Sequence, residues 1–406
     1  MLSNTNFSDP KYDLEADYTE AFRHIHNVLK SRLIAWSVDR YTFFRKVGEG
    51  YFGQVFQVQH CITKEISAVK CIKMRSGNEF PIGDLREIRV MLTLQHENLL
   101  RLKEICYNFH NSLFNSNAQF YLVVEFCERN LTQLIAQTYL PNGAKKALLG
   151  QLFKGLSYLH SNHVMHRDLK PCNILVNDRG VLKIGDFGLS RFITQFCEPD
   201  EAERETFTGP VITLWYRPPE ILFNDRQYGK AVDMWSVGCI MAEFWTRYPI
   251  LQGINEYDQL LRIITICGSI NSQVYPGVER LNSVLLTNMP SNYKRRVRES
   301  LSYVVDEVNA LYLIDKLLVC DPKQRITVDE ALSHEYFHSI PPPAPLNTSN
   351  LPQFGTQHYF YCNYFPYIAD LSAAVVPGQG GNIVPMPLCL YYDPFSGFSI
   401  FYPIFF

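Results

Sequence analysis

The chain has 406 residues, a hydrophobic content of 47% and a formal net charge of −2 at neutral pH. This length allows one large two-lobed domain with tails, or two ordinary domains, and the apolar content supports a sizeable core. A net charge near zero gives no global attraction to DNA, RNA or anionic lipid, so we expect no direct binding to nucleic acid or membrane.

The eleven cysteines stand singly, without a Cys-x-x-Cys pair or a Cys/His cluster at zinc spacing. We expect no secretory leader at the N-terminus and no transmembrane helix, because the apolar runs are short and interrupted. We therefore expect reduced thiols in an intracellular protein.

Residues 1–40 mix polar and acidic positions with a mildly amphipathic stretch, and we expect an N-terminal extension there. Residues 55–59, 66–72 and 121–124 are rich in β-branched side chains and are predicted to be strands. A helix is predicted to begin at Pro81. Its apolar positions recur at helical spacing: Ile82, Leu85, Ile88, Met91 and Leu92.

After residue 126 the pattern becomes mostly helical. One apolar stripe runs from Leu149 to Leu159, and Val232–Trp245 is apolar nearly all round, as in a buried helix. The packed domain is expected to end near Phe337, because three prolines follow from Pro341. These elements predict an α+β fold with a β-rich part at about 41–126 and a larger helical part at about 127–340.

Residues 341–406 contain no Lys or Arg and only two Asp, but many Tyr, Phe and Pro. The periodicity is poor, so we expect a disordered or loosely attached tail. Its aromatic content leaves open that it docks on something.

The most specific motif is His166-Arg167-Asp168-Leu169-Lys170, with Asn173 five residues after the Asp and Asp186-Phe187-Gly188 thirteen after the Asn. Phosphoryl transfer from a nucleotide needs these parts in this order. An acid accepts the proton of the attacking hydroxyl, an amide and a carboxylate hold Mg²⁺, and a lysine neutralises developing charge.

A glycine-rich stretch lies upstream, with Gly48, Gly50 and Gly53 followed by Val55. Glycines let a hairpin backbone approach phosphates closely. A dinucleotide site would require a helix next, whereas a second strand, which contains Ala68-Val69-Lys70, follows here. Lys70 is therefore expected to bind the α- and β-phosphates, and Glu87, in the helix from Pro81, to pair with Lys70.

Together these motifs resemble the eukaryotic protein kinases over about residues 41–340. The resemblance implies a bilobal kinase fold and the use of ATP and Mg²⁺. It also implies that Asp168 orients and deprotonates the substrate hydroxyl, that Lys170 contacts the transferred phosphoryl group, and that Asn173 and Asp186 bind Mg²⁺. For adenine, it implies backbone contacts from Glu125 and Cys127 and an apolar slot formed by Val55, Ala68 and Leu175.

Within that family, residues 81–89 look like the cyclin-binding helix of cyclin-dependent kinases, and Thr213–Glu220 is similar to that group's segment after the activation loop. Several stretches are most similar to the transcription-elongation branch, which implies a T-type cyclin bound through the helix at 81–94. Gly83-Asp84 departs from the Thr-Ala typical of that branch. Gly and Asp are poorer helix formers, although an acid near a helix N-terminus is favourable.

The loop between Asp186 and Glu220 contains Thr208, which matches the family's activation threonine. A phosphate there would carry about −1.5 to −2 charges. Arginine forks suit phosphate bidentately, and the resemblance points to three of them: Arg86, Arg167 and Arg191.

Val211 and Ile212 resemble the family's apolar platform for a proline after the phosphorylated residue, so Ser-Pro or Thr-Pro substrates are expected. The branch implies the RNA polymerase II C-terminal domain and elongation factors as substrates, and a nuclear location. Two alternatives stay open: another cyclin-dependent kinase with a different cyclin and substrates, and a pseudokinase scaffold.

Three further expectations concern structure. Glu220 and Arg325 are expected to form a buried ion pair, and Asp233 to brace the catalytic-loop backbone, as in kinases generally. The basic run at 294–298 is either a solvated helix face or a nuclear localisation signal.

Overall fold

The computed structural model describes residues 36–50, 53–72, 82–108, 119–193, 214–225, 227–281, 283–348 and 351, and two short strands near the C-terminus. The chain divides into two compact units, 1–362 and 363–406. In the second unit, β12 (Leu390–Tyr392) and β13 (Ser399–Phe401) pair antiparallel. The predicted disorder of the tail lies mostly outside the described residues.

The N-terminal lobe of the first unit is built on a six-stranded sheet in the order β1-β5-β6-β4-β3-β2. All neighbours are antiparallel except β1, which runs parallel to β5. The strands are β1 (Trp36–Ser37), β2 (Tyr41–Gly50), β3 (Gly53–His60), β4 (Ile66–Ile72), β5 (Leu102–Asn108) and β6 (Gln119–Glu125). The three strands predicted from β-branched runs are thus confirmed.

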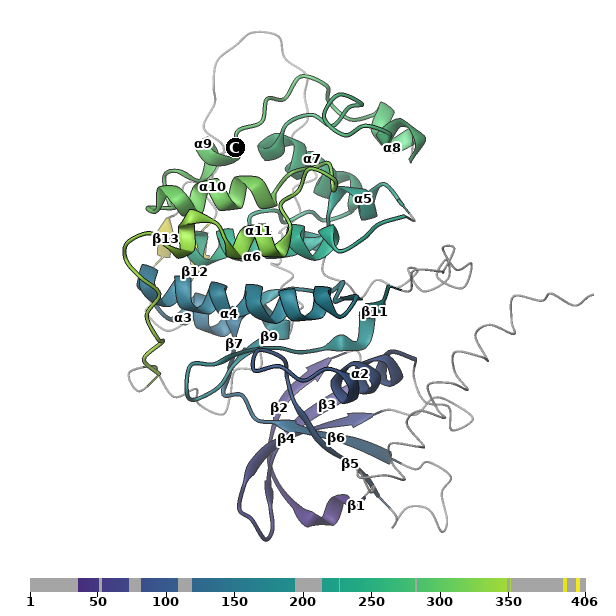
Figure 1. The fold of residues 1–406 in the computed structure, drawn as a ribbon, viewed down its shortest axis with the longest axis vertical. Coiled ribbons are helices and arrows are strands. Elements are labelled where there is room, and N and C mark those ends of the chain that lie inside the picture. Colours follow the sequence, from purple (N-terminus) through teal and green to yellow (C-terminus); the bar gives the residue numbers. More distant parts are fainter. Residues whose placement is uncertain are drawn as a thin grey trace, which may run out of the picture. The chain divides into compact units, whose positions relative to one another are not determined.

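Helix α2 (Ile82–Thr93) lies beside this sheet (Figure 1). Leu85, Ile88 and Met91 are buried in the same core as Ile72 and Leu122 of the sheet. The helix predicted from its apolar spacing is therefore confirmed from Ile82 onward, while Pro81 lies outside the described residues.

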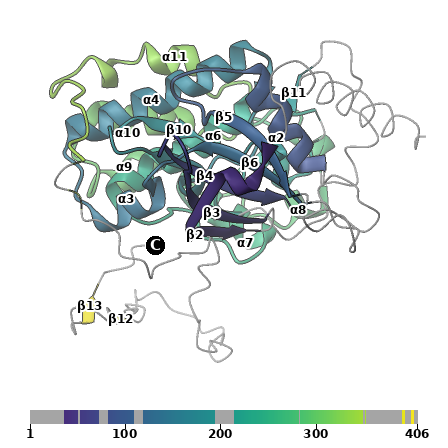
Figure 2. The same ribbon diagram turned by 90° about the horizontal axis from the view of Figure 1, so that it is seen from below.

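The C-terminal lobe is mostly helical, as predicted (Figures 1 and 2). Its α-helices are α3 (Leu131–Gln137), α4 (Asn142–Ser161), α5 (Pro219–Leu222), α6 (Ala231–Thr246), α7 (Glu256–Cys267), α8 (Ser283–Thr287), α9 (Val297–Leu301), α10 (Val308–Leu317) and α11 (Val328–Leu332). Its short strands are β7 (Arg129–Asn130), β8 (Val164–Met165), β9 (Ile174–Val176), β10 (Leu182–Ile184) and β11 (Arg191–Phe192). Six 3-10 turns connect described elements across the chain: η1 (Val38–Arg40), η2 (Pro171–Asn173), η3 (Phe187–Leu189), η5 (Leu214–Tyr216), η6 (Val278–Arg280) and η7 (Glu335–Phe337).

Local chemistry explains where several helices begin. Asn130 caps α3 by a reciprocal pair of hydrogen bonds with Gln133, and Thr327 caps α11 in the same way with Glu330. Helix α6 needs no amphipathic face, because every residue from Val232 to Trp245 is buried. This helix forms the centre of the lobe.

Residues on both sides of the expected domain, 41–340, also make described contacts with it. Strand β1 pairs with β5 before residue 41. At the other end, Leu346 is buried in the core of the lobe, and the Ala344 N–H donates to the Gly143 carbonyl at 2.9 Å. The prolines after Phe337 therefore end the helical pattern without ending the packed domain.

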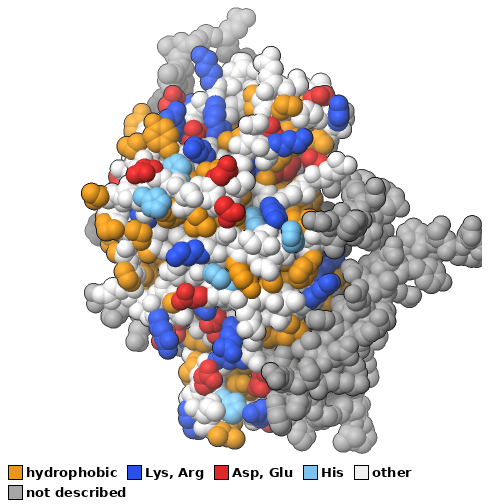
Figure 3. Space-filling model, viewed as in Figure 1, with side chains coloured by type: hydrophobic (Ala, Val, Ile, Leu, Met, Phe, Trp, Pro, Cys, Tyr) orange, Lys and Arg blue, Asp and Glu red, His pale blue; other side chains and the backbone are white. Residues whose placement is uncertain are grey.

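No described helix is long and apolar enough to span a membrane. On the face drawn in Figure 3, basic and acidic side chains are interspersed over the described surface.

Candidate active site

The catalytic-loop side chains converge on one carboxylate. Lys170 Nζ donates to Asp168 Oδ2 at 2.8 Å, and Asn173 Nδ2 donates to the same oxygen at 3.0 Å and to the Asp168 carbonyl at 2.8 Å. Burial raises the pKa of Asp168, and the positive charge of Lys170 opposes this shift. The sequence motif thus folds into a compact acid–lysine–amide cluster.

Asp233 on α6 fixes the backbone of this loop, as expected. Its two carboxylate oxygens accept the N–H groups of His166 at 2.9 Å and Arg167 at 2.8 Å. His160 Nε2 also lies 2.9 Å from Asp233 Oδ2. Although burial alone would raise the pKa of Asp233, these hydrogen bonds and nearby histidines lower it, so the brace stays ionised.

Asp186 has the features of a cation ligand. Its backbone is left-handed, with a φ of +59°. This conformation is uncommon for a non-glycine residue, and it occurs more often at functional sites than elsewhere. Its buried Oδ1 accepts no hydrogen bond within the described part of the chain, which fits a metal ligand. No cluster of three or more His, Cys, Asp or Glu able to hold a metal occurs among the described residues. Asp186 and the Asn173 amide are the residues that would hold a divalent metal, together with phosphates and water.

Lys70 on β4 meets Glu87 on α2, where Nζ donates to Glu87 Oε2. Asp84 Oδ1 lies 3.3 Å from the same nitrogen. Burial lowers the pKa of Lys70, but the carboxylates Glu87, Asp186 and Asp84 together raise it above its usual value. Burial raises the pKa of Glu87 to about 7 against the pull of Lys70. The predicted Lys70–Glu87 pair is present, with Asp84 beside it.

The glycine-rich stretch forms the hairpin between β2 and β3. Gly48 pairs with Val55 and Gly50 with Gly53, while the two residues at the turn lie outside the described chain. Gly53 has a φ of +137°, and a Cβ there would lie 2.1 Å from the Cys71 carbonyl oxygen. Only glycine therefore fits at Gly53.

The expected adenine-site residues lie on the N-terminal sheet, on β9 of the C-terminal lobe and on the chain between the lobes. Ala68 on β4 is buried, and Val55 and Leu175 are partly buried against the same core. The Glu125 side chain accepts from the Arg101 N–H at 2.8 Å and pairs with Lys183 at 3.0 Å. Burial raises the pKa of Cys127 to about 12, so its thiol is neutral.

The three expected regulatory arginines are described, whereas Thr208, Val211 and Ile212 lie outside the described residues. Arg167 Nε donates to the Leu189 carbonyl at 2.7 Å and Nη1 to Tyr228 Oη at 2.6 Å. Arg86 lies on α2 and Arg191 on β11. Their convergence on one phosphate stays a prediction.

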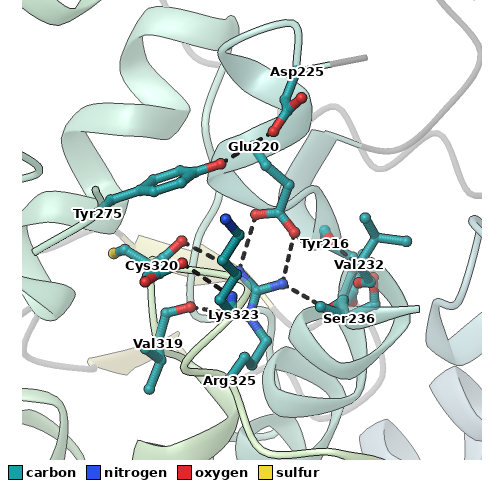
Figure 4. A network of polar contacts seen from close by, with 12 residues as sticks. Tyr216, Glu220, Asp225, Val232, Ser236, Tyr275, Val319, Cys320, Lys323 and Arg325 are labelled. Carbon is teal, nitrogen blue, oxygen red and sulfur yellow. Dashed lines mark hydrogen bonds and ion pairs between the residues drawn. The ribbon is translucent and has the colours of Figure 1, made fainter. Parts of the chain in front are cut away.

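The predicted buried ion pair is confirmed, and both side chains are fully inaccessible. Arg325 binds Glu220 through two parallel hydrogen bonds of 2.7 and 2.9 Å (Figure 4). Arg325 also donates to the carbonyls of Ala231 and Val319, at 2.6 and 2.9 Å. One guanidinium thus ties together α5, the start of α6 and the α10–α11 connection.

The basic run at 294–298 is not a single solvated helix face. Helix α9 begins only at Val297. Arg295 donates to the Leu318 carbonyl at 2.9 Å, and Arg296 donates through Nε to the Thr265 carbonyl at 2.9 Å. These arginines join α7 to the end of α10, an arrangement that spacing alone did not indicate.

Sequence reasoning missed Tyr228 and His160, which hold Arg167 and Asp233. It also treated Asp84 only as a helix residue. A signal existed for Asp84, because it precedes Glu87 by three residues and therefore shares its helix face. No local signal marks Tyr228, whose partner lies 61 positions away.

The two lobes, the hairpin and the catalytic cluster define a protein kinase. The model of the protein kinase domain family matches residues 41–337. Cyclin-dependent kinase 9-B of Xenopus laevis is 42% identical over 316 residues, covering 76% of this chain and 83% of that protein. Cyclin-dependent kinase 9 of Homo sapiens is 41% identical over 312 residues, with the same coverage.

Among solved structures, a crystal structure of the yeast RNA Pol II CTD kinase CTDK-1 complex matches with a TM-score of 0.67 and 32% identity, covering 76% of this chain and 96% of that chain. The chain belongs to the cyclin-dependent kinase family of protein kinases. It is a serine/threonine kinase similar to cyclin-dependent kinase 9, and this family assignment implies the use of ATP and a divalent metal and a cyclin partner.

Proposed function

We propose that the chain transfers the γ-phosphate of ATP to Ser-Pro or Thr-Pro sites of the RNA polymerase II C-terminal domain and of elongation factors, and so promotes transcription elongation. The observation that carries the proposal is the cluster around Asp168, whose Oδ2 is shared by Lys170 and Asn173 at 2.8 and 3.0 Å. The polymerase substrate is supported by the similarity to one solved structure, that of the yeast RNA Pol II CTD kinase CTDK-1 complex.

In this proposal Asp168 accepts the proton of the substrate hydroxyl. Burial raises the pKa of Asp168, which makes the carboxylate a better general base. Lys170 is already bonded to Asp168. Its ammonium would neutralise the negative charge that grows on the transferred group. When bound, ATP supplies the phosphoryl group and Mg²⁺ neutralises its oxygens. Asn173 and Asp186 would hold the metal, and Lys70, oriented by Glu87, would bind the α- and β-phosphates.

The nucleotide would enter between the hairpin and the chain joining the lobes. Gly48, Gly50 and Gly53 would let backbone N–H groups approach the phosphates. Adenine would meet backbone groups of Glu125 and Cys127. Its apolar slot would be lined by Val55, Ala68 and Leu175.

We further propose a T-type cyclin bound through α2 and a nuclear location. Both rest on the similarity to cyclin-dependent kinase 9. Phosphorylated Thr208 would draw together Arg86, Arg167 and Arg191. We expect Thr208→Ala to lower activity strongly while nucleotide binding is kept, and full activity of this variant would reject the switch.

The test is Mg-ATP phosphate transfer to a Ser-Pro heptad-repeat peptide, with Asp168→Asn as the blank. The chain is assayed alone, with a T-type cyclin and with other cyclins. Activity that requires the T-type cyclin supports the whole proposal. Activity with another cyclin only would keep the kinase and reject the elongation role. An inactive chain with every cyclin, despite phosphorylated Thr208, would favour a scaffold.

A further inference from the structure

A second carboxylate lies at Lys70. Asp84 is in the first turn of α2, three residues before Glu87, so both side chains lie on one helix face. Asp84 is 1% exposed and Glu87 is 4% exposed. Both acids therefore point into the interior between α2 and the sheet, where each needs a countercharge to remain ionised.

The contact of Asp84 with Lys70 is an ion pair without a hydrogen bond. Asp84 Oδ1 lies 3.3 Å from Lys70 Nζ. The same oxygen has no hydrogen-bond partner in the described ranges, whereas Lys70 donates to Glu87. The two acids thus share one ammonium, with Glu87 taking the hydrogen bond.

The usual role of an acid in a first helical turn is to complement the positive end of the helix from a solvated position. Asp84 does not match that role, because its carboxylate is buried and faces Lys70. Gly83, the preceding residue, also makes this turn a weak helix start. Asp84 is therefore better explained by its contact with Lys70 than by helix stability.

The charge balance at this point has a consequence for nucleotide binding. Three carboxylates interact electrostatically with the Lys70 ammonium and raise its pKa, namely Glu87, Asp186 and Asp84. Phosphates that bind Lys70 must compete with these groups, and like charges nearby oppose an anionic ligand. A third acid weakens that binding, yet it also keeps Lys70 oriented when Glu87 is lost.

We propose that Asp84 is a positioning residue that shares Lys70 with Glu87, weakening ATP binding and serving as a reserve partner for the lysine. This inference rests on the proposed function, because it takes Lys70 as the phosphate-binding lysine. It concerns a residue of this chain that the kinase motifs do not include.

The first test compares Asp84→Ala and Asp84→Asn with the parent chain, all with cyclin. We expect KM for ATP to fall about fivefold in both variants, which is an effect of the size usual for contacting charged residues. The value of kcat should stay within about twofold of the parent. Glu97→Gln, which removes one exposed charge elsewhere, is the matched control and should leave KM unchanged. A parental KM in Asp84→Asn would mean that shape and not charge matters, and would overturn the proposal.

The second test is a double-mutant cycle. Glu87→Gln should lower kcat/KM about tenfold more in the Asp84→Ala background than in the parent, because Lys70 then has neither α2 acid to hold it. Equal losses in the two backgrounds would overturn the reserve role. Melting temperatures of the single variants show whether each one is folded.

A third measurement separates this inference from the proposed function. ATP affinity is measured by calorimetry in Asp168→Asn, with and without Asp84→Ala, where no phosphate transfer is needed. Tighter binding on removal of Asp84 supports its role even if no substrate is phosphorylated, and unchanged affinity rejects it even if the kinase is active.

Discussion

The carboxylate of Asp233, on α6, accepts the backbone N–H of Arg167 at 2.8 Å. Arg167 has a φ of +68°, and a left-handed non-glycine residue costs about 1–2 kcal/mol. Such a conformation persists when its surroundings impose it. The most buried helix of the lobe thus holds the strained residue that directly precedes Asp168, which links core packing to catalytic geometry.

Asp233→Asn is expected to lower kcat at least tenfold. An amide can accept only one of the two backbone N–H groups, and its own NH₂ would face the other, so the catalytic loop loses its fixed position. Steady-state kinetics with the heptad-repeat peptide measures the effect. KM for ATP should change less, because Lys70 and the hairpin are untouched. A kcat within twofold of the parent would contradict the brace.

Arg325→Met is expected to destabilise the chain by about 3–5 kcal/mol, because it leaves the fully buried Glu220 without its partner. Urea denaturation measures the loss. The double variant Arg325→Met/Glu220→Leu should recover part of it, since no buried charge remains. A double variant no more stable than Arg325→Met would show that the carbonyl contacts of Arg325 matter more than the ion pair.

Sequence patterns identified site residues where the chemistry requires a particular residue type at a particular spacing. Lys70, Asp168, Asn173 and Asp186 were identified because phosphoryl transfer restricts their spacing. The strands followed from their β-branched content. Helix α2 followed from periodicity, which reports the buried face of an element directly. The family resemblance added the partner of Arg325, which lies 105 positions away.

Contacts between distant segments were less predictable. Three prolines after Phe337 indicated the end of the domain, but Leu346 is buried in the lobe, because chain without helical periodicity can still pack. Likewise, a run of arginines looks the same whether it is solvated or bonded to carbonyls. Asp84 was judged by helix propensity, and its contact with Lys70 depends on how α2 sits against β4.

Gly53→Ala is expected to raise KM for ATP by at least tenfold. The added Cβ would meet the Cys71 carbonyl oxygen at 2.1 Å, and φ at this position is +137°. The start of β3 must therefore move away from β4, which changes the shape of the β2–β3 hairpin expected to cover the phosphates. Gly229→Ala is the matched control, because a Cβ there meets nothing within 4 Å. An unchanged KM in Gly53→Ala would argue against a tight hairpin.

Glu243→Gln is expected to remove a pH dependence of stability. Burial raises the pKa of Glu243 from 4.5 to about 7, while the hydroxyl of Tyr216 donates to it at 2.6 Å. A raised carboxyl pKa favours the folded state at pH below about 4.5, and this advantage is lost as pH rises through 7. The loss amounts to ~3 kcal/mol.

The measurement is the urea midpoint at pH 5 and pH 8 for both proteins. The glutamine keeps an acceptor for Tyr216, so the variant should match the parent at pH 5 and exceed it at pH 8. Equal differences at the two pH values would show that Glu243 does not titrate in this window.

Lys146→Met is expected to loosen the C-terminal end of the domain. Lys146 is fully buried on α4, and its Nζ donates to the carbonyls of Ser339 at 2.9 Å and Pro341 at 2.8 Å. It also lies 3.0 Å from Glu307 Oε1. The methionine fills similar space but leaves these acceptors unpaired, at a cost of about 3–5 kcal/mol.

Limited proteolysis should then cut residues 339–351 sooner than in the parent. The control is Lys154→Met, which replaces an exposed lysine on the same helix and should not change the cleavage rate. If both variants are cut at the parental rate, the buried lysine does not hold this segment, and its attachment must come from Leu346 and the apolar contacts around it.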